Sequence, residues 1–376
     1  MIWLKIIRYL CKIKLLKLRM KMLLSSFSYK TSEWELSEIN ALKRTNLLVG
    51  KNAAGKTRTI RALQYVTAFL RMKPELLAPK AFKTRLTFIE PDNNGWDLTY
   101  AFEIDNNIVI GEQLVVCGKT LLKRNRENTL LNGETINPPA DKLTVQVRRD
   151  RNAYPEIEKL MAWAEGLMAV SCSDINPFTI INEKSGYINP IPFSELVGSL
   201  DKEEKESVIK DAKRMGYEIS DMALIEANSE IKLVAVRERD MQNGLLDFQL
   251  SSGMLRVLYI LCFLEYIRHT DNYSMLLIDD LGEGLDYSRA THIGEKVFNA
   301  CENGNLQLIA SSNDSFLMDV VDISKWQIVR SKNSKLSVIN QTNQPELFEM
   351  FRMTGLSNFD LFSSDFIDNF LARSAE

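Results

Sequence analysis

A glycine-rich loop between a short apolar strand and a helix constrains the fold of this 376-residue chain more than any other feature. Its eight residues fit the pattern GxxxxGK[ST] in full: Gly50, Lys51, Asn52, Ala53, Ala54, Gly55, Lys56 and Thr57. Residues 46–49 before the loop predict a buried strand, and residues 58–72 after it predict a helix with an apolar face. This order of strand, loop and helix is the context in which the pattern binds phosphate. The sequence therefore predicts an α/β nucleotide-binding domain.

Each residue type in the loop has a physical reason to be there. Gly50 and Gly55 permit a tight turn whose backbone N–H groups face an anion, and the helix that follows directs its positive end at the same place. Lys56 reaches the β- and γ-phosphates, and the Thr57 hydroxyl is a ligand for Mg²⁺. We therefore expect ATP and Mg²⁺ as cofactors, with the whole loop and Thr59 among the nucleotide contacts.

A second apolar strand ends in two carboxylates. Residues 275–278 lead directly to Asp279 and Asp280. Asp279 at the strand tip is placed to hold Mg²⁺ through water, as the acidic strand-end residue does in P-loop NTPases. Asp280 follows it in a position to orient and deprotonate an attacking water. Adjacent acids are common in loops, but beside a phosphate loop we interpret this pair as functional.

Three further motifs occur in the order and at the spacing found in ABC-type ATPases. They are a run similar to the LSGGQ signature (Leu250, Ser251, Ser252, Gly253, Met254), the end of a D-loop (Leu285, Asp286) and a switch-like run (Ser312, Asn313, Asp314). On these residues the chain resembles the ABC-type ATPases. The resemblance implies an α/β P-loop head of the ABC type with an inserted antiparallel β lobe and a helical lobe.

The resemblance also implies a site shared between two copies of the chain. In such ATPases the helix that begins with the signature faces the γ-phosphate bound by the opposite subunit, and its serine hydroxyl and amides donate to that anion. Ser251, Ser252, Gly253 and Asp286 would then contact the nucleotide, and the protein would act as a homodimer or a higher oligomer. Asn313 would contact the γ-phosphate and, with Lys56 and Asp280, complete the catalytic set.

Among ABC-type proteins, the chain is similar to the soluble branch that includes the overcoming-lysogenisation-defect (OLD) ATPases and related phage-defence ATPases. There the phosphate loop lies near the N-terminus and a β-rich insertion follows it, as here. This resemblance implies a dimeric switch that controls a separate effector protein, such as a nuclease or toxin, in antiphage defence.

Three positions depart from the family pattern and predict slow hydrolysis. Asp280 stands where the family has Glu and is one methylene shorter. Asn313 replaces the switch His, so it can form hydrogen bonds but cannot be protonated. Met254 replaces the signature Gln. The glutamine of the family's Q-loop has two candidates, Gln146 first and Gln113 next.

The predicted core is divided by a long insertion. We expect an ATPase core in residues 22–85 and 245–345, a β-rich insertion in 86–150, a helical and mixed lobe in 151–244, and an aromatic tail in 346–376. Inside these regions the patterns predict strands at 86–90, 96–104, 108–117, 120–123, 143–147, 231–236, 274–278 and 306–310, and helices at 155–169, 193–216 and 250–266 and from 288.

The two ends of the chain have unusual compositions. Residues 1–21 form a basic extension in which seven cations interrupt an apolar run, too often for a membrane span or a signal peptide. It is a packed extension, sequence before a start at Met20 or Met22, or a functional arm; we favour the first two. The tail contains six phenylalanines among acids, and we favour its docking on the same chain over a partner site.

Charge and cysteine content restrict the remaining functions. The net charge of −2 argues against attraction of nucleic acid over the whole surface. A second hypothesis, a DNA-repair-like ATPase that clamps nucleic acid between two heads, rests on the basic clusters 123–126 and 148–151. A transporter subunit is the least expected, because no membrane span is evident. Five cysteines without ligand spacing predict buried thiols and a cytoplasmic location.

Overall fold

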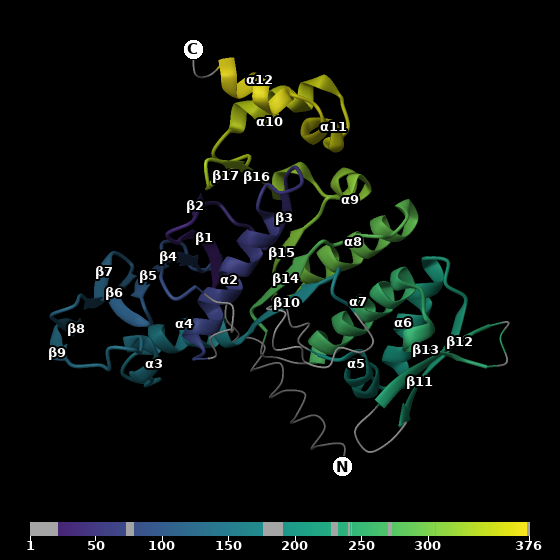
Figure 1. Ribbon diagram of the computed structural model, residues 1–376, viewed down its shortest axis with the longest axis horizontal. Helices are drawn as coiled ribbons and strands as arrows, with labels where there is room; N and C mark the ends of the chain where they lie inside the picture. The colour runs from purple at the N-terminus through teal and green to yellow at the C-terminus, as the bar shows by residue number, and fades with distance from the viewer. Residues whose placement is uncertain are drawn as a thin grey trace.

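The computed structural model (Figure 1) describes residues 22–72, 79–175, 191–226, 232–239, 241, 243–269, 273–304 and 306–373. The basic extension predicted for residues 1–21 lies outside them. Within the described residues the strands form one sheet of 14 strands and one of three. Helices and strands alternate along much of the chain, so the predicted α/β class is confirmed.

Five strands form the parallel part of the large sheet. Their order is β10 (Leu167–Ser171), β14 (Met275–Asp279), β15 (Gln307–Ser311), β3 (Thr45–Val49) and β16 (Trp326–Lys332). The central strands β14, β15 and β3 are buried along their whole length, as expected for strands covered on both faces. Because all five run in one direction, the residues that follow β3, β14 and β15 meet at one edge of the sheet.

Helices cover both faces of this parallel sheet. Neighbouring residues of a strand point to opposite faces, so Leu47 belongs to one hydrophobic cluster and Leu48 to the other. The helices α2 (Lys56–Leu70) and α4 (Pro155–Glu165) pack in the cluster of Leu48. The helices α7 (Ser252–His269) and α8 (Tyr287–Glu302) pack in the cluster of Leu47. The result is a layer of strands between two layers of helices.

The predicted β-rich region extends the same sheet. After β16 come β17 (Lys335–Ile339), β2 (Glu35–Ile39), β1 (Leu23–Lys30), β4 (Phe82–Ile89), β5 (Asp97–Asp105), β6 (Ile108–Val116), β7 (Lys119–Arg124), β8 (Thr129–Leu131) and β9 (Glu134–Ile136). Beyond β16 the neighbouring strands pair in antiparallel fashion except β17 and β2, which are parallel. In β4 and β5 buried residues alternate with less buried ones, which is typical of a sheet with one face on a core. The β lobe and the five parallel strands therefore belong to one continuous hydrogen-bonded sheet.

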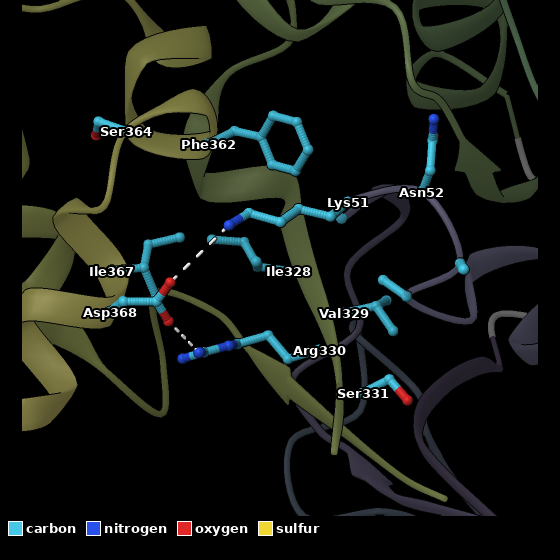
Figure 2. Close-up of a pocket in the computed structure, with 13 residues that line it drawn as sticks. Lys51, Asn52, Ile328, Val329, Arg330, Ser331, Phe362, Ser364, Ile367 and Asp368 are labelled. Atoms are coloured by element: carbon cyan, nitrogen blue, oxygen red, sulfur yellow. Dashed lines mark hydrogen bonds and ion pairs between the residues drawn. The ribbon is translucent and has the colours of Figure 1, made fainter. Parts of the chain in front are cut away.

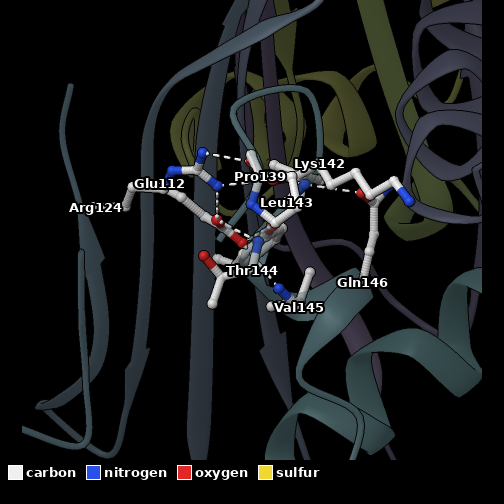
Figure 3. A network of polar contacts seen from close by, with 9 residues as sticks. Glu112, Arg124, Pro139, Lys142, Leu143, Thr144, Val145 and Gln146 are labelled. Carbon is white, nitrogen blue, oxygen red and sulfur yellow. Dashed lines mark hydrogen bonds and ion pairs between the residues drawn. The ribbon is translucent and has the colours of Figure 1, made fainter. Parts of the chain in front are cut away.

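The strand predicted at residues 143–147 is a short helix, α3 (Thr144–Val147). The buried carboxylate of Glu112 on β6 accepts hydrogen bonds from Thr144 N at 2.7 Å and Val145 N at 3.2 Å (Figure 3). The Gln146 side chain accepts one from Leu143 N at 2.8 Å. These side chains satisfy the amides that a helix leaves unpaired at its start, so the apolar run becomes a helical turn and not a strand.

The helical lobe also differs from the prediction at its boundaries. The predicted helix 155–169 is α4 alone, because the chain turns at Gly166 and enters the edge strand β10. The predicted helix 193–216 is two helices, α5 (Phe193–Ser199) and α6 (Lys202–Arg214). Asp201 caps α6 by accepting from Glu204 N, and this new N-terminus separates them. Strands β11 (Ile219–Glu226), β12 (Lys232–Glu238) and β13 (Leu245–Leu246) and the 3₁₀ turn η1 (Asp247–Gln249) follow.

The aromatic tail forms three helices on the rest of the chain. They are α10 (Pro345–Thr354), α11 (Asn358–Ser363) and α12 (Phe366–Arg373), drawn in yellow in Figure 1. Leu347, Phe348 and Phe351 are buried in the same cluster as α7 and α8. The tail also contacts α9 (Ser315–Val320), which precedes the 3₁₀ turn η2 (Ile323–Lys325). Docking on the same chain, the favoured interpretation of the tail, agrees with this structure.

Among the described cysteines, Cys172, Cys262 and Cys301 are buried free thiols, as predicted. Cys117 is exposed, contrary to the prediction, because it occupies a hairpin turn with a φ of 47°. In the part of the chain that the structure describes, no helix has both the length and the apolar character needed to cross a membrane.

Candidate phosphate-binding site

A cavity of about 510 Å³ lies where the phosphate loop meets the carboxyl ends of the parallel strands. It gathers side chains from five separate segments of the chain. The lining residues are Tyr29, Trp34, Asn52, Ala53, Gly55, Lys56, Thr57, Arg58, Arg61, Tyr65, Pro79, Asp280 and Asn313. The predicted loop, one of the two strand-end acids and the switch-like asparagine therefore meet at one cavity.

The backbone of the loop requires its two glycines. A Cβ atom at Gly50 would lie 2.6 Å from the carbonyl oxygen of Val329, and one at Gly55 would lie 2.7 Å from the Leu336 side chain. Gly55 also has a φ of 101°, in the left-handed region that favours glycine. Ala53 adopts a φ of 64° as well. These backbone conformations fold the loop tightly at the N-terminal end of α2.

Lys56 places a buried ammonium group at the centre of the loop. Its Nζ donates to the Gly50 carbonyl at 2.6 Å, and the residue is 5% exposed. Burial lowers the pKa of Lys56, while the nearby carboxylates of Asp279 and Asp280 favour its charged form. A cation held among inward-facing amides and the positive end of a helix is suited to a polyphosphate.

Thr57 and Asp279 form the pair expected to hold a divalent cation. Thr57 Oγ1 donates to Asp279 Oδ1 at 3.2 Å, and Ser311 Oγ donates to the same oxygen at 2.5 Å. Asp279 is 2% exposed, so this contact fixes a buried carboxylate beside the loop. Hydroxyl and carboxylate oxygens are the ligands Mg²⁺ takes together with phosphates and water, and the residues present fit it.

The chain leaves the extended conformation of β14 at Asp280, and this residue lines the cavity. Its φ of 56° is left-handed, and its backbone N–H donates to Ser311 Oγ at 2.9 Å, which holds this turn in place. Burial, with Asp279 and Glu283 alongside, raises the pKa of Asp280 to about 6. Such a carboxylate has a higher proton affinity than an exposed one, which suits a general base.

The signature-like residues lie outside this cavity. Ser251 and Ser252 are exposed at the start of α7, where Ser251 Oγ accepts from Met254 N at 3.2 Å. Gly253 packs beside Leu285 of the following loop. The Met254 side chain is buried in the hydrophobic core. It packs α7 against that core and is not exposed to a ligand.

Asp286 and Thr59 also have local structural partners. Asp286 caps α8 by accepting from Arg289 N at 3.1 Å. The Thr59 hydroxyl donates to the Gly55 carbonyl at 2.9 Å, and Thr59 does not line the cavity. This contact supports the loop from inside α2, and Thr59 as a nucleotide contact stays a prediction.

The opposite side of the phosphate loop faces the tail. Gly50, Lys51 and Ala54 line a second cavity of about 260 Å³ together with residues of β16 and α12 (Figure 2). The Lys51 ammonium lies 4.0 Å from the Asp368 carboxylate, toward which it points in Figure 2, and Lys51 does not line the first cavity. In this loop the side chain of Lys51 therefore serves the tail, and only its backbone remains a candidate phosphate contact.

Neither glutamine predicted for the Q-loop lies at the site. Gln146 is buried in α3, where its amide donates to the carbonyl oxygen of Phe69 at 2.6 Å. Gln113 is exposed on β6 in the antiparallel lobe. The segment that adjoins the acidic pair is instead the end of β10, because Ser171 pairs with Asp279 and Cys172 N donates to Asp279 O at 3.0 Å.

One wall of the cavity was not predicted from the sequence. Tyr29 and Trp34 come from the β1–β2 hairpin, and Tyr65 comes from α2. The guanidinium carbon of Arg58 lies 5.4 Å from the centroid of the Trp34 ring. An aromatic ring beside a cation suits a planar base next to phosphates. In the sequence these aromatic residues belong to no motif. Their place at the cavity follows from the β1–β2 hairpin, which comes shortly after the N-terminal extension.

Comparison with known proteins agrees with this geometry. The model of a family described as "AAA domain, putative AbiEii toxin, Type IV TA system" matches residues 45–319, from the strand before the phosphate loop to the helix after the switch. No curated protein matches the sequence.

The chain also aligns with solved structures at low sequence identity. A crystal structure of an Smc head bound to the C-terminal winged-helix domain of ScpA aligns with a TM-score of 0.52 and 11% identity, over 84% of this chain and 96% of that one. An SMC head domain from Thermotoga maritima aligns with a TM-score of 0.45 and 13% identity, over 84% and 98%. The first alignment shows a shared fold, that of an Smc head.

Proposed function

Because this chain belongs to the family described as AAA domain, putative AbiEii toxin of a type IV toxin–antitoxin system, and has the P-loop fold of ABC-type ATPases, we propose that it is an ATP-driven dimeric switch. One observation carries the proposal. The cavity gathers Lys56, Asp280 and Asn313, whereas the exposed signature-like helix end lies outside it. A second copy can supply the missing donors to the γ-phosphate.

ATP would stabilise the closed dimer through differential binding. In the proposed arrangement the phosphate loop of one copy and Ser251 to Gly253 of the other both contact the γ-phosphate. ADP lacks this phosphate and gives the second copy no anion to bind, so only ATP shifts the equilibrium toward the closed state. Mg²⁺ held by Thr57 and Asp279 would neutralise charge that develops on the phosphates.

Hydrolysis is proposed to be slow. Asp280 must reach the attacking water from a side chain one methylene shorter than Glu, and Asn313 offers hydrogen bonds but no cationic form. A long-lived ATP state suits a protein that holds or releases a partner. We propose that the partner is a separate effector in antiphage defence, in agreement with the toxin–antitoxin description of the family and the sequence resemblance.

The test measures assembly against nucleotide. We expect Asp280→Asn, which keeps the shape of the side chain but removes the base, to shift from the 43.0 kDa monomer to a dimer in Mg·ATP and to remain monomeric in Mg·ADP. Lys56→Ala is the control that should not shift in either nucleotide. Mass photometry reports both states. No change of mass or conformation with ATP would refute the switch, and turnover as fast as a transporter ATPase would refute slow hydrolysis.

The structure does not favour the second hypothesis, a nucleic-acid clamp. In the cluster 123–126, Arg124 is buried and donates to the carbonyl oxygens of Pro139 and Lys142. In the cluster 148–151, Arg149 is paired with Glu158 and Glu165. Because the central arginine of each cluster has a partner in the chain, we base no function on them.

A further inference from the structure

One hydroxyl group lies between two carboxylates beside the cavity. Ser173 Oγ is 3.1 Å from Asp280 Oδ2 and 2.9 Å from Glu283 Oε2. A serine hydroxyl has one hydrogen, so it donates to one carboxylate at a time. No motif in the sequence singled out Ser173 or Glu283, and neither belongs to the predicted catalytic set.

The register of the sheet fixes this contact. β10 pairs with β14 in parallel, with Ser171 opposite Asp279, and Cys172 N donates to Asp279 O at 3.0 Å. Ser173 therefore leaves the end of β10 next to the point where Asp280 leaves the end of β14. The pairing of β10 with β14 brings the exposed Ser173 hydroxyl within reach of Asp280.

The loop that carries Glu283 is also held. Arg256 Nη1, in the second turn of α7, donates to the Glu283 carbonyl oxygen at 2.8 Å. Gly284 follows with a φ of 72°, and a Cβ there would collide with the Arg256 guanidinium. The backbone at Glu283 and Gly284 therefore lies directly against Arg256 of α7.

The backbone of Asp280 is fixed, which leaves only its side chain to be directed. The backbone N–H donates to Ser311 Oγ, whereas the carboxylate has Ser173 as its hydrogen-bonding side-chain partner in the described structure. A short carboxylate in an open cavity needs such a partner to keep one direction, and misplacement by about 1 Å can slow a reaction about 100-fold.

We propose that Ser173 is a positioning residue for Asp280, and that Glu283 anchors Ser173 from the other side. By binding Oδ2, the Ser173 hydroxyl leaves Oδ1 free to accept the proton of the water that attacks the γ-phosphate. This inference rests on the proposed ATPase function. Gln146 and Gln113 both lie away from the site, so neither can orient Asp280, whereas Ser173 at the end of β10 can.

The test separates chemistry from binding. We expect Ser173→Ala to lower kcat on the order of tenfold while the dissociation constant for ATP changes less than about twofold. Ser173→Thr keeps the hydroxyl and should retain kcat within about threefold. Ser220→Ala is the matched control, because the Ser220 hydroxyl is exposed and bonds the Arg237 carbonyl on the separate three-stranded sheet. A serine with only a structural role would change the unfolding midpoint but not kcat alone.

A double-mutant comparison shows whether Ser173 acts through Asp280. In an Asp280→Asn background, Ser173→Ala should cause no further loss of kcat, because the group that it orients is already gone. A full tenfold loss in that background, or wild-type kcat in the single variant, would overturn the proposal.

Glu283→Gln gives an independent decision if Ser173→Ala does not fold. This exposed substitution should lower kcat a few-fold in the wild type and cause no further loss in the Asp280→Asn background, where the group that Ser173 orients is already gone. Unchanged kcat in Glu283→Gln would then overturn the proposal. A wild-type protein that binds no ATP or never hydrolyses it would instead refute the proposed function.

Discussion

Two lysines of the phosphate loop face opposite sides of it. Lys56 is buried against the loop carbonyls, whereas Lys51 reaches the tail. We expect Lys56→Ala to weaken ATP binding about 100-fold, because a charge-assisted contact to the phosphates is lost. Lys51→Ala, which removes a similar charge from the same loop, should change it less than about threefold. Titration with a fluorescent ATP analogue measures both, and equal losses would contradict the orientation seen here.

Glu112 is the buried acid that holds α3 against the β lobe. Its carboxylate accepts from Thr144 N, Val145 N and the Tyr100 hydroxyl, the last at 2.8 Å, and lies 3.8 Å from Arg124 (Figure 3 shows the Thr144, Val145 and Arg124 contacts). Burial raises the pKa of Glu112, which these hydrogen bonds partly oppose. Each oxygen is therefore an acceptor that the fold requires.

We expect Glu112→Gln to lower the free energy of unfolding by about 2–4 kcal/mol, because an amide NH₂ would face backbone donors and Arg124 would lose its counter-charge. Glu103→Gln is the control, since Glu103 on the neighbouring strand forms an exposed pair with Lys83 at 3.3 Å and should cost less than about 1 kcal/mol. Urea unfolding compares the two variants. Equal midpoints would show that the buried network contributes nothing.

At the residue scale, the sequence predicted the candidate phosphate-binding groups but not the residues that orient them. The loop from Gly50 to Thr57 and the acid Asp279 follow from chemistry that needs fixed spacing. Ser311 and Ser173 hold the two acids only because β15 and β10 lie beside β14. The sequence of one segment does not determine which strand pairs with it in the sheet. Ser311 and Ser173 could therefore not be predicted.

At the element scale, the same limit explains the incorrect boundaries. Apolar runs predicted the buried strands β3, β14 and β15 well, because burial on both faces leaves a continuous apolar signal. The run 143–147 has the alternation of a half-buried strand, with Thr144 and Gln146 between apolar residues, yet the distant Glu112 made it helical by accepting its amides. Likewise, the helix predicted to 169 loses its last residues to β10, whose partner β14 lies more than 100 residues later.

The tail helices offer a prediction at this scale. Phe348 of α10 is fully buried in the main core, whereas Met353 in the same helix is 85% exposed. We expect Phe348→Ala to lower the free energy of unfolding by about 3–5 kcal/mol through the cavity it leaves, and Met353→Ala by about 0.5 kcal/mol or less. Thermal unfolding of the two variants is the measurement. A small effect of Phe348→Ala would mean that the tail is not part of the folded core.

At the scale of the whole molecule, the three-layer arrangement separates the phosphate loop from the signature-like helix end. The loop follows β3 and packs through α2 on one face, while α7 packs on the other. Tyr287 and Phe316 lie near the switch and D-loop residues with 60% and 38% of their surface exposed, and their rings contact edge to face at 5.0 Å. Exposed aromatic side chains of this kind are enriched at protein–protein interfaces, which agrees with the proposed dimer.

A mixing experiment tests whether two copies share each site. Lys56→Ala disables the loop and leaves the signature-like residues intact. Ser252→Glu leaves the loop intact and places a negative charge where the partner's γ-phosphate would lie, at an exposed helix start that tolerates an acid. Each variant alone should be inactive, since every site that two of its copies could form contains one defect.

Mixed dimers of these two variants should regain activity. One site of such a dimer combines both defects, and the other combines the intact loop with the intact signature-like helix. With random pairing about half of the dimers are mixed and each has one working site of two, so we expect at least roughly a quarter of the wild-type ATPase rate, and up to about half if the pairs without a working site do not assemble. If all catalytic groups came from a single chain, mixing would restore nothing. Recovery on mixing therefore distinguishes a shared site from a self-contained one without any assumption about the effector.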